Sequence, residues 1–142
     1  MNERKLSTII FYDEKKRFLL QNKVGISNFG EEWDAFSWFV NGRERPKNVL
    51  MSNIRTELKE DIKDFQFFRK YDVDLSWGGE TGHFVVNVYI SRFPGFDKFN
   101  QQEGSHGLRL FEFQETLNYI KSRRIFPFYE NIFGDILQYL SV

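Results

Sequence analysis

The feature that most constrains the fold of this chain is a single apolar stripe near its middle. Leu50, Ile54, Leu58 and Ile62 recur at every fourth position. On an α-helix this spacing puts the four side chains on one face, which indicates an amphipathic helix. Pro46 suits the first turn of such a helix, where its missing N–H costs nothing. The pattern predicts one continuous helix from Pro46 to Lys63, with an apolar face that another layer must cover.

The segments on both sides of this helix have the character of β-strands. Before it, the apolar runs 6–12 and 17–22 are separated by a charged turn at 13–16 and predict a hairpin. After it, the runs 65–77 and 82–93 flank Gly78-Gly79, whose backbone freedom suits a reversal, and predict a second hairpin. The alternating run 108–113 predicts one more strand, and 114–122 and 129–140 predict two further helices.

This order of elements favours an α+β or α/β/α layered architecture with a mixed sheet. The 142 residues fit one domain, 1–142, which at this size buries roughly 68–70% of its unfolded surface. There are 17 Phe residues, and aromatic residues make up 18% of the chain. We interpret them chiefly as core packing, with stacking of rings on a nucleobase as the alternative.

Charge and cysteine content exclude several classes of function. Lys and Arg number 20, and so do Asp and Glu, so no global field draws the chain to nucleic acid or to an anionic membrane. The absence of cysteine excludes disulfides, thiolate metal sites and thiol catalysis. The polar start of the sequence, together with the lack of an apolar run near the roughly 20 residues of a membrane span, favours a cytoplasmic location.

The stretch WDAFSWFVNGRERPKNVLMSNIRTE, residues 33–57, resembles the signature of the Nudix (MutT-like) family, Gx5Ex7REUxEExGU, which forms a loop and a helix carrying Mg²⁺-binding carboxylates. Aligned without a gap, the chain keeps the apolar scaffold positions of that motif. Those positions are Trp33, Phe36, Val40, Pro46, Val49, Leu50, Ile54 and Leu58. Of the box carboxylates, only Glu44 and Glu57 remain.

The other functional positions of the motif are replaced in this register. Ser52 and Asn53 stand for its Arg-Glu, and Thr56 stands for the first Glu of its final pair. Bulky side chains at 37–39 replace the glycines of a phosphate-approaching loop. The box is therefore degenerate.

A second register, shifted by four residues, is also open. It puts Gly42 at the box glycine and lets TELKED, 56–61, stand for the acidic helix, with Glu57, Glu60 and Asp61 retained. It needs an insertion after Trp33 and places Asn53 where a small apolar residue belongs, so we prefer the gap-free register.

The resemblance extends over nearly the whole chain. The run 8–23 is similar to the opening hairpin of the family, and EGSHGLRLFEF, 103–113, is similar to a late segment that contributes an acid near the metals, a place held here by Glu103. The resemblance implies a Nudix-like α/β/α sandwich with a central mixed β-sheet.

The resemblance also implies a set of site residues. Glu44, Glu57 and Glu60 are the expected metal ligands, and Glu57 and Glu103 the expected catalytic groups, with Mg²⁺ or Mn²⁺ as the cofactor if the site is active. On an α-helix Asn53, Glu57 and Glu60 project within about 60° of one another, which suits oxygen ligation of Mg²⁺. The alternative is an ordinary solvated acidic face.

Three functions remain in competition. The first is a Nudix-type pyrophosphohydrolase, acting on acid anhydrides in nucleoside diphosphate-linked substrates but weak or inactive because of its box. The second is a non-catalytic module that binds a nucleotide-like small molecule or regulates through it. The third is an aromatic-rich interaction domain, possible as a homodimer through exposed rings at 36–39. His83 is interpreted as a packed or edge residue and His106 as a solvated loop residue, with no zinc site between them.

Overall fold

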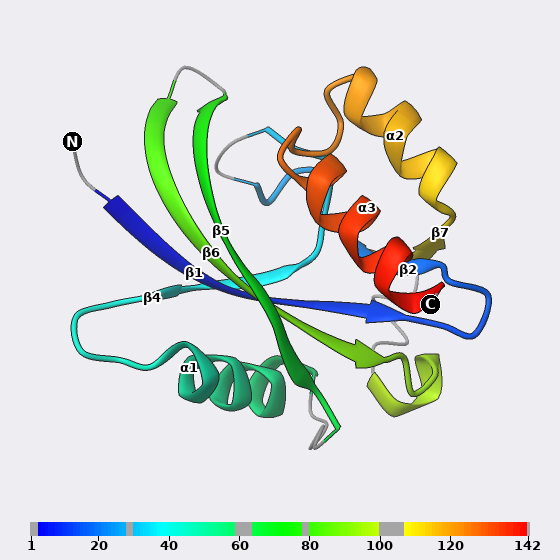
Figure 1. The fold of residues 1–142 in the computed structure, drawn as a ribbon, viewed down its shortest axis with the longest axis horizontal. Helices are drawn as coiled ribbons and strands as arrows, with labels where there is room; N and C mark the ends of the chain where they lie inside the picture. The colour runs from blue at the N-terminus through cyan, green and yellow to red at the C-terminus, as the bar shows by residue number, and fades with distance from the viewer. Residues whose placement is uncertain (1–2, 28–29, 59–63, 78–79, 100–106, 142) are drawn as a thin grey trace.

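The computed structural model describes residues 3–27, 30–58, 64–77, 80–99 and 107–141. A mixed β-sheet crosses the molecule, with α1 on one side and α2 and α3 on the other (Figure 1). The strands are β1 (Glu3–Tyr12), β2 (Phe18–Asn22), β3 (Trp33–Asp34), β4 (Phe36–Val40), β5 (Gln66–Trp77), β6 (Glu80–Arg92) and β7 (Leu108–Phe111). The helices are α1 (Pro46–Asn53), α2 (Phe113–Lys121) and α3 (Tyr129–Leu140), with a π-helical turn η1 (Ile54–Leu58) and a 3₁₀ turn η2 (Phe96–Phe99).

Both predicted hairpins are confirmed, and the sheet is mixed because of one pairing. The central path runs β3-β2-β1-β6-β5, while β4 pairs with β1 and β7 with β2. β1 and β6 are parallel over their whole common length, from Glu3 opposite His83 to Tyr12 opposite Arg92. The other pairs are antiparallel. The expected layered α+β architecture is therefore present.

Each face of the sheet carries its own aromatic-rich core. On the α3 side, Phe133 stacks on Phe18, with 4.7 Å between ring centroids, and on Tyr129, with 5.1 Å. On the α1 side, Phe99 meets Phe11 edge to face at 5.0 Å, beside Leu50 and Ile54 of the helix. Many of the phenylalanines thus serve the core, as expected.

The central helix changes its hydrogen-bonding geometry at Ile54. α1 begins at Pro46 as predicted, and its buried Leu50 and the buried Ile54 of η1 face the sheet. At Ile54 the hydrogen bonding becomes π-helical, which widens the turn, so an angle of 100° per residue does not hold through Glu57. The rest of the predicted helix, 59–63, lies outside the described residues.

Residues 36–39 form strand β4, so the expected loop there is wrong. Ser37 lies opposite Thr8, and Trp38 opposite Ser7, in the antiparallel ladder with β1. Strand alternation buries Phe36 in the α1-side core and leaves Phe39, 44% exposed, on the other face. Because Phe36 is buried, the rings at 36–39 do not form one exposed surface, and the interaction with a partner stays a prediction.

The C-terminal elements match the predictions closely. β7 ends two residues earlier than expected, α2 begins one residue earlier, and α3 has the predicted bounds. Within the described part of the chain, no helix combines the length and the apolar character needed to cross a membrane.

Candidate ligand-binding site

A pocket opens where the chain crosses from one strand of the sheet to another. β3 pairs with β2, β4 pairs with β1, and Ala35 alone separates them. β1 and β2 pair at Tyr12 and Phe18, beside their turn. The cavity, of about 180 Å³, is closed on the α3 side by Tyr129. It is lined by Leu6, Lys23, Ile26, Ser27, Glu31, Asp34, Ser37, Phe39, Leu75, Phe84, Phe126, Phe128 and Tyr129.

Two buried carboxyl groups form the polar part of this pocket. Asp34 is 9% exposed and its Oδ1 accepts a 2.6 Å hydrogen bond from the Tyr129 hydroxyl. Glu31 is 5% exposed and its Oε1 accepts a hydrogen bond from the Ser27 hydroxyl. Each carboxyl group is therefore held by one hydroxyl.

Burial dominates the electrostatics of this carboxyl pair. It raises the pKa of Asp34 to about 7, and the charge of Glu31 raises that pKa as well, while the Tyr129 hydrogen bond and Lys23 act to lower it. Burial likewise raises the pKa of Glu31, against the charge of Lys23 and a hydrogen bond with Asp34. Neighbouring buried carboxyls disfavour double ionisation, so the pair holds a proton near neutral pH.

Aromatic rings form the walls of the pocket. Phe84 and Phe126 are buried, and Phe128 is half-buried. Phe126 stacks on Phe128 at 5.6 Å, and Phe128 lies 4.6 Å from the Tyr129 ring, which fixes the orientation of this wall. Apolar walls with a few converging polar groups are the usual composition of a small-molecule site.

A second cavity, of about 400 Å³, shares Lys23 and Ser37 with the first. Glu57, from the π-helical turn, lines it, and its Oε2 accepts a hydrogen bond from the indole N–H of Trp38. The indole stands in the position that the resemblance assigns to a glycine. One of the two surviving box carboxylates is therefore bonded by a protein donor.

Glu44 lines a different cavity from the one that Glu57 lines. It lines a third cavity with Asn48 and Asn53, and its Oε1 accepts a 2.8 Å hydrogen bond from the backbone N–H of Asn41. Asn53, at the position of a box Glu, donates to the carbonyl of Val49 at 2.8 Å. Glu44 and Glu57 therefore line different cavities.

Two of the predicted site residues, Glu60 and Glu103, lie outside the described residues, as do Asp61 and His106. The shifted register depends on Glu60 and Asp61 and stays a prediction. Within the residues that the structure does describe, no group of three or more His, Asp or Glu side chains is placed to hold a metal ion. The Mg²⁺ or Mn²⁺ requirement also stays a prediction.

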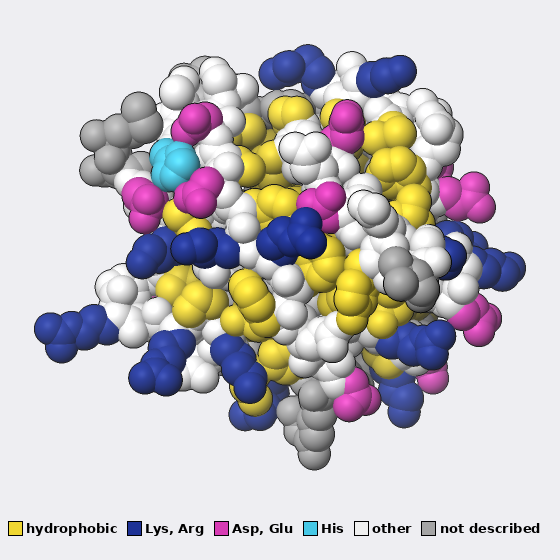
Figure 2. Space-filling view, viewed as in Figure 1, with side chains coloured by type: hydrophobic (Ala, Val, Ile, Leu, Met, Phe, Trp, Pro, Cys, Tyr) yellow, Lys and Arg dark blue, Asp and Glu magenta, His cyan; other side chains and the backbone are white. Residues whose placement is uncertain are grey.

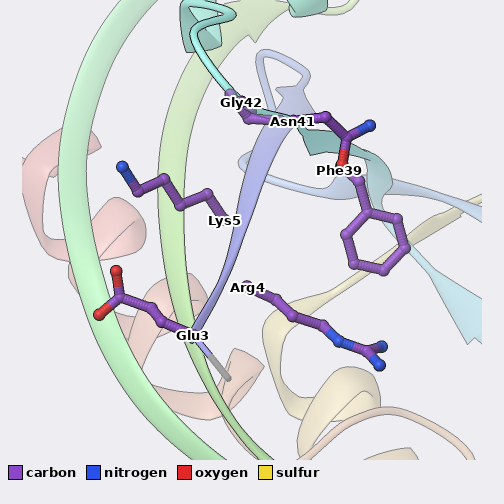
Figure 3. A pocket seen from close by; sticks show the side chains of 7 residues that line it. Glu3, Arg4, Lys5, Phe39, Asn41 and Gly42 are labelled. Carbon is purple, nitrogen blue, oxygen red and sulfur yellow. The ribbon is translucent and has the colours of Figure 1, made fainter. Parts of the chain in front are cut away.

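Phe39 separates the ligand pocket from a shallower surface pocket of about 440 Å³. Figure 3 shows Arg4 and Phe39 on one side of β1, and Glu3 and Lys5 on the other. The Arg4 guanidinium lies 5.9 Å from the centroid of the Phe39 ring, within the range of a cation–π contact. The outer face of Phe39 thus already contacts a cation.

His83 belongs to a cluster of acidic side chains on the surface of the sheet. Its Nδ1 lies 2.8 Å from Asp74 and its Nε2 3.2 Å from Asp72, with Glu3 at 3.9 Å. Figure 2 shows acidic side chains gathered round the histidine of this face. The hydrogen bonds with Asp74 and Asp72 raise the pKa of His83. β6 is an interior strand, and His83 lies between Glu3 of β1 and Asp74 of β5, so it is packed between neighbouring strands and is not an edge residue.

Sequence reasoning missed the residues that build the pocket. Glu31, Asp34 and Lys23 had no motif, and Tyr129 was seen only as a helix residue. One signal was available, since Asp34 stands between Trp33 and Ala35-Phe36 in an otherwise apolar run, where a carboxylate needs a buried partner. That partner is 95 positions away in the sequence.

Comparison with known proteins supports the fold through structure. The sequence matches no family model and no curated protein. Three solved structures illustrate the likeness. An Ap4A hydrolase of C. elegans is 11% identical, with a TM-score of 0.67 over 98% of this chain and 99% of that one. A MutT protein of Methanosarcina mazei Go1 is 12% identical, with a TM-score of 0.67 over 99% and 96%. A mutT/nudix family protein of Listeria innocua is 12% identical, with a TM-score of 0.65 over 97% and 94%.

Identities this low show the fold alone. The chain has a Nudix-like fold, with the mixed sheet and flanking helices that the resemblance implied.

Proposed function

We propose that this chain is a Nudix-fold binding module for a nucleotide-like small molecule, with weak or absent hydrolysis of ordinary nucleoside diphosphate derivatives. The observation that carries the proposal is the contrast between two sites. The pocket round Asp34 is lined by aromatic rings and two buried carboxyl groups. The surviving box carboxylates that the structure describes line separate cavities, and they accept hydrogen bonds from protein donors.

The size of the pocket selects what enters it. Its volume of about 180 Å³ is below the ~300–1,000 Å³ of sites that enclose a whole drug-sized ligand. One heteroaromatic ring system suits it better than a complete nucleotide. The remainder of such a ligand would extend past Lys23 and Ser37, the residues shared with the cavity beside Glu57.

The chemistry of the box argues against efficient hydrolysis. Diphosphate hydrolysis in this fold needs carboxylates that concentrate metal ions and activate water. Ser52, Asn53 and Thr56 remove an Arg and two Glu in the preferred register. The Trp38 indole donates a hydrogen bond to Glu57, one of the two box carboxylates that remain. Loss of one electrostatic catalytic group typically costs ~10²–10³ in rate.

Binding is tested with a matched pair of variants. Phe39→Ala removes an exposed wall of the pocket, and Phe96→Ala removes an equally exposed ring, also 44%, on the η2 turn outside the pocket lining. Affinity for nucleosides and nucleoside monophosphates is measured by titration calorimetry. We expect Phe39→Ala to weaken binding about tenfold or more and Phe96→Ala to leave it unchanged. An equal effect of both, or no binding by the wild type, would contradict the proposal.

Hydrolysis is tested separately on nucleotide sugars, dinucleotides and nucleoside triphosphates with added Mg²⁺ or Mn²⁺. We expect little turnover, and no difference between the wild type and Glu57→Gln. Robust turnover that Glu57→Gln abolishes would establish a hydrolase instead.

A further inference from the structure

The two cavities that share Lys23 and Ser37 carry a surplus of negative groups. Their lining residues include three carboxylic acids, Glu31, Asp34 and Glu57, and one cationic side chain, Lys23. None of the residues that line these two cavities is an arginine. A ligand with positive charge in the pocket gains from this arrangement, and a further anion does not.

The walls favour the same charge. The face of an aromatic ring is its negative part, so a cation between such faces is attracted to them, most strongly where water is excluded. Phe39, Phe84, Phe126 and Phe128 line the pocket, and Phe126 and Phe128 stack on each other within its wall. Arg4 already uses the attraction on Phe39, outside the ligand pocket.

The carboxyl pair can change its charge to match a ligand. The Tyr129 hydroxyl holds one oxygen of Asp34 and the Ser27 hydroxyl one oxygen of Glu31, and the two carboxyl groups act on each other directly. Lys23 is the cationic group that acts on both, and Tyr129, which has a pKa raised well above its usual value by burial, stays neutral. With the pocket empty, a proton on the pair relieves the repulsion between its members.

We propose that the preferred ligand is a nucleoside-like molecule whose heteroaromatic ring carries a delocalised positive charge, and that the Glu31–Asp34 pair releases a proton when this ring enters. The carboxylic O–H bond breaks, its electrons stay on the carboxylate, and the proton passes to solvent. The charge of the ring then takes the place of the proton. This inference rests on the proposed binding function and names the ligand class of that site.

The test compares two nucleosides that differ by one methyl group and one charge. Guanosine is neutral, and 7-methylguanosine carries a delocalised positive charge on the same ring system. Both are titrated into the full chain at about pH 6, in two buffers with different ionisation enthalpies, so that calorimetry reports the protons released. We expect 7-methylguanosine to bind at least ~10-fold more tightly, with release of up to about one proton, and guanosine to release none.

Conservative variants assign the effect to the pair. Asp34→Asn and Glu31→Gln keep an oxygen acceptor for Tyr129 and Ser27 but cannot become anionic. We expect each to lower the preference for the charged nucleoside toward unity and to lower proton release. Glu14→Gln, in the exposed β1–β2 turn, is the matched control and should change neither. Circular dichroism and thermal melting show whether each variant folds.

The outcomes separate the two proposals. Equal affinity for the two nucleosides without proton release would overturn the ligand class and leave the binding function standing. Failure of both nucleosides, and of the other ligands, to bind would overturn the binding function itself. A preference for 7-methylguanosine that survives in Asp34→Asn and Glu31→Gln would show that the aromatic walls select the charge alone, and would overturn the role of the pair.

Discussion

At the scale of single residues, the buried hydrogen bond from Tyr129 to Asp34 joins α3 to β3. Removing the hydroxyl in Tyr129→Phe leaves a buried carboxyl oxygen without its donor. We expect the free energy of unfolding to fall by about 1–3 kcal/mol, and the pKa of Asp34 to rise further, because this hydrogen bond favours the ionised form. Urea denaturation and a carbon-13 NMR titration measure these two effects. Tyr139→Phe, on the exposed side of the same helix, should cost no more than ~0.5 kcal/mol.

Asp34 also gives the stability a pH dependence of unusual sign for a carboxyl group. Its pKa is raised from 3.8 to about 7 in the folded state, so the folded chain binds the proton more tightly than the unfolded chain. The cost of ionising Asp34 is absent below about pH 4, grows between about pH 4 and pH 7, and is complete above. We expect Asp34→Asn to gain stability relative to the wild type as pH rises across this range, because the variant has no carboxyl group to ionise. A constant difference between pH 4.5 and pH 8 in denaturation experiments would contradict the assignment.

At the scale of elements, the β5–β6 hairpin carries a pH dependence of the same direction as that of Asp34, in a higher pH range. Asp74 and Asp72 on β5 raise the pKa of His83 on β6, so the protonated form is favoured by folding. This contribution is fully present below the usual histidine pKa of about 6.5 and is lost as pH rises through the higher folded value. We expect His83→Gln to be destabilising at about pH 6 and nearly neutral at about pH 9. An NMR titration of His83 at or below the ordinary value would argue against it.

Periodicity predicted which elements form, but not how they meet. The four-residue spacing found α1, and the alternating runs found both hairpins, because the burial of one face depends on local spacing alone. The π-helical turn after Asn53, the strand at 36–40 and the pocket depend on long-range packing instead. The motif pointed to Glu44 and Glu57, whose roles were inferred from the carboxylates of the Nudix signature. The contact between Asp34 and Tyr129 has no counterpart in that signature.

At the scale of the whole molecule, the sheet separates two cores that should respond independently. Ile54 lies in the α1-side core and Ile136 in the α3-side core, both buried. Each Ile→Val change should cost about 0.5–1.5 kcal/mol, and the double variant should show the sum within ~0.5 kcal/mol, because the two residues belong to different clusters of buried residues. Denaturation of the single and double variants gives the coupling. Ile132→Val combined with Ile136→Val, within one core and one helical turn, is the comparison in which deviation from additivity is expected.

The parallel pairing of β1 with β6 has a consequence for the order in which the chain acquires its structure during synthesis. Every residue of β1 faces a partner made 80 positions later. Its other edge can be covered by β2 and β4 once residue 40 has emerged, but the edge toward β6 stays open until residue 92. At translation rates of ~5–20 residues per second, the 80 residues that separate a β1 residue from its β6 partner take about 4 to 16 s to synthesise. For that time a strand containing Ile9, Ile10 and Phe11 offers an unpaired edge, so nascent chains shorter than 92 residues should depend most on chaperones.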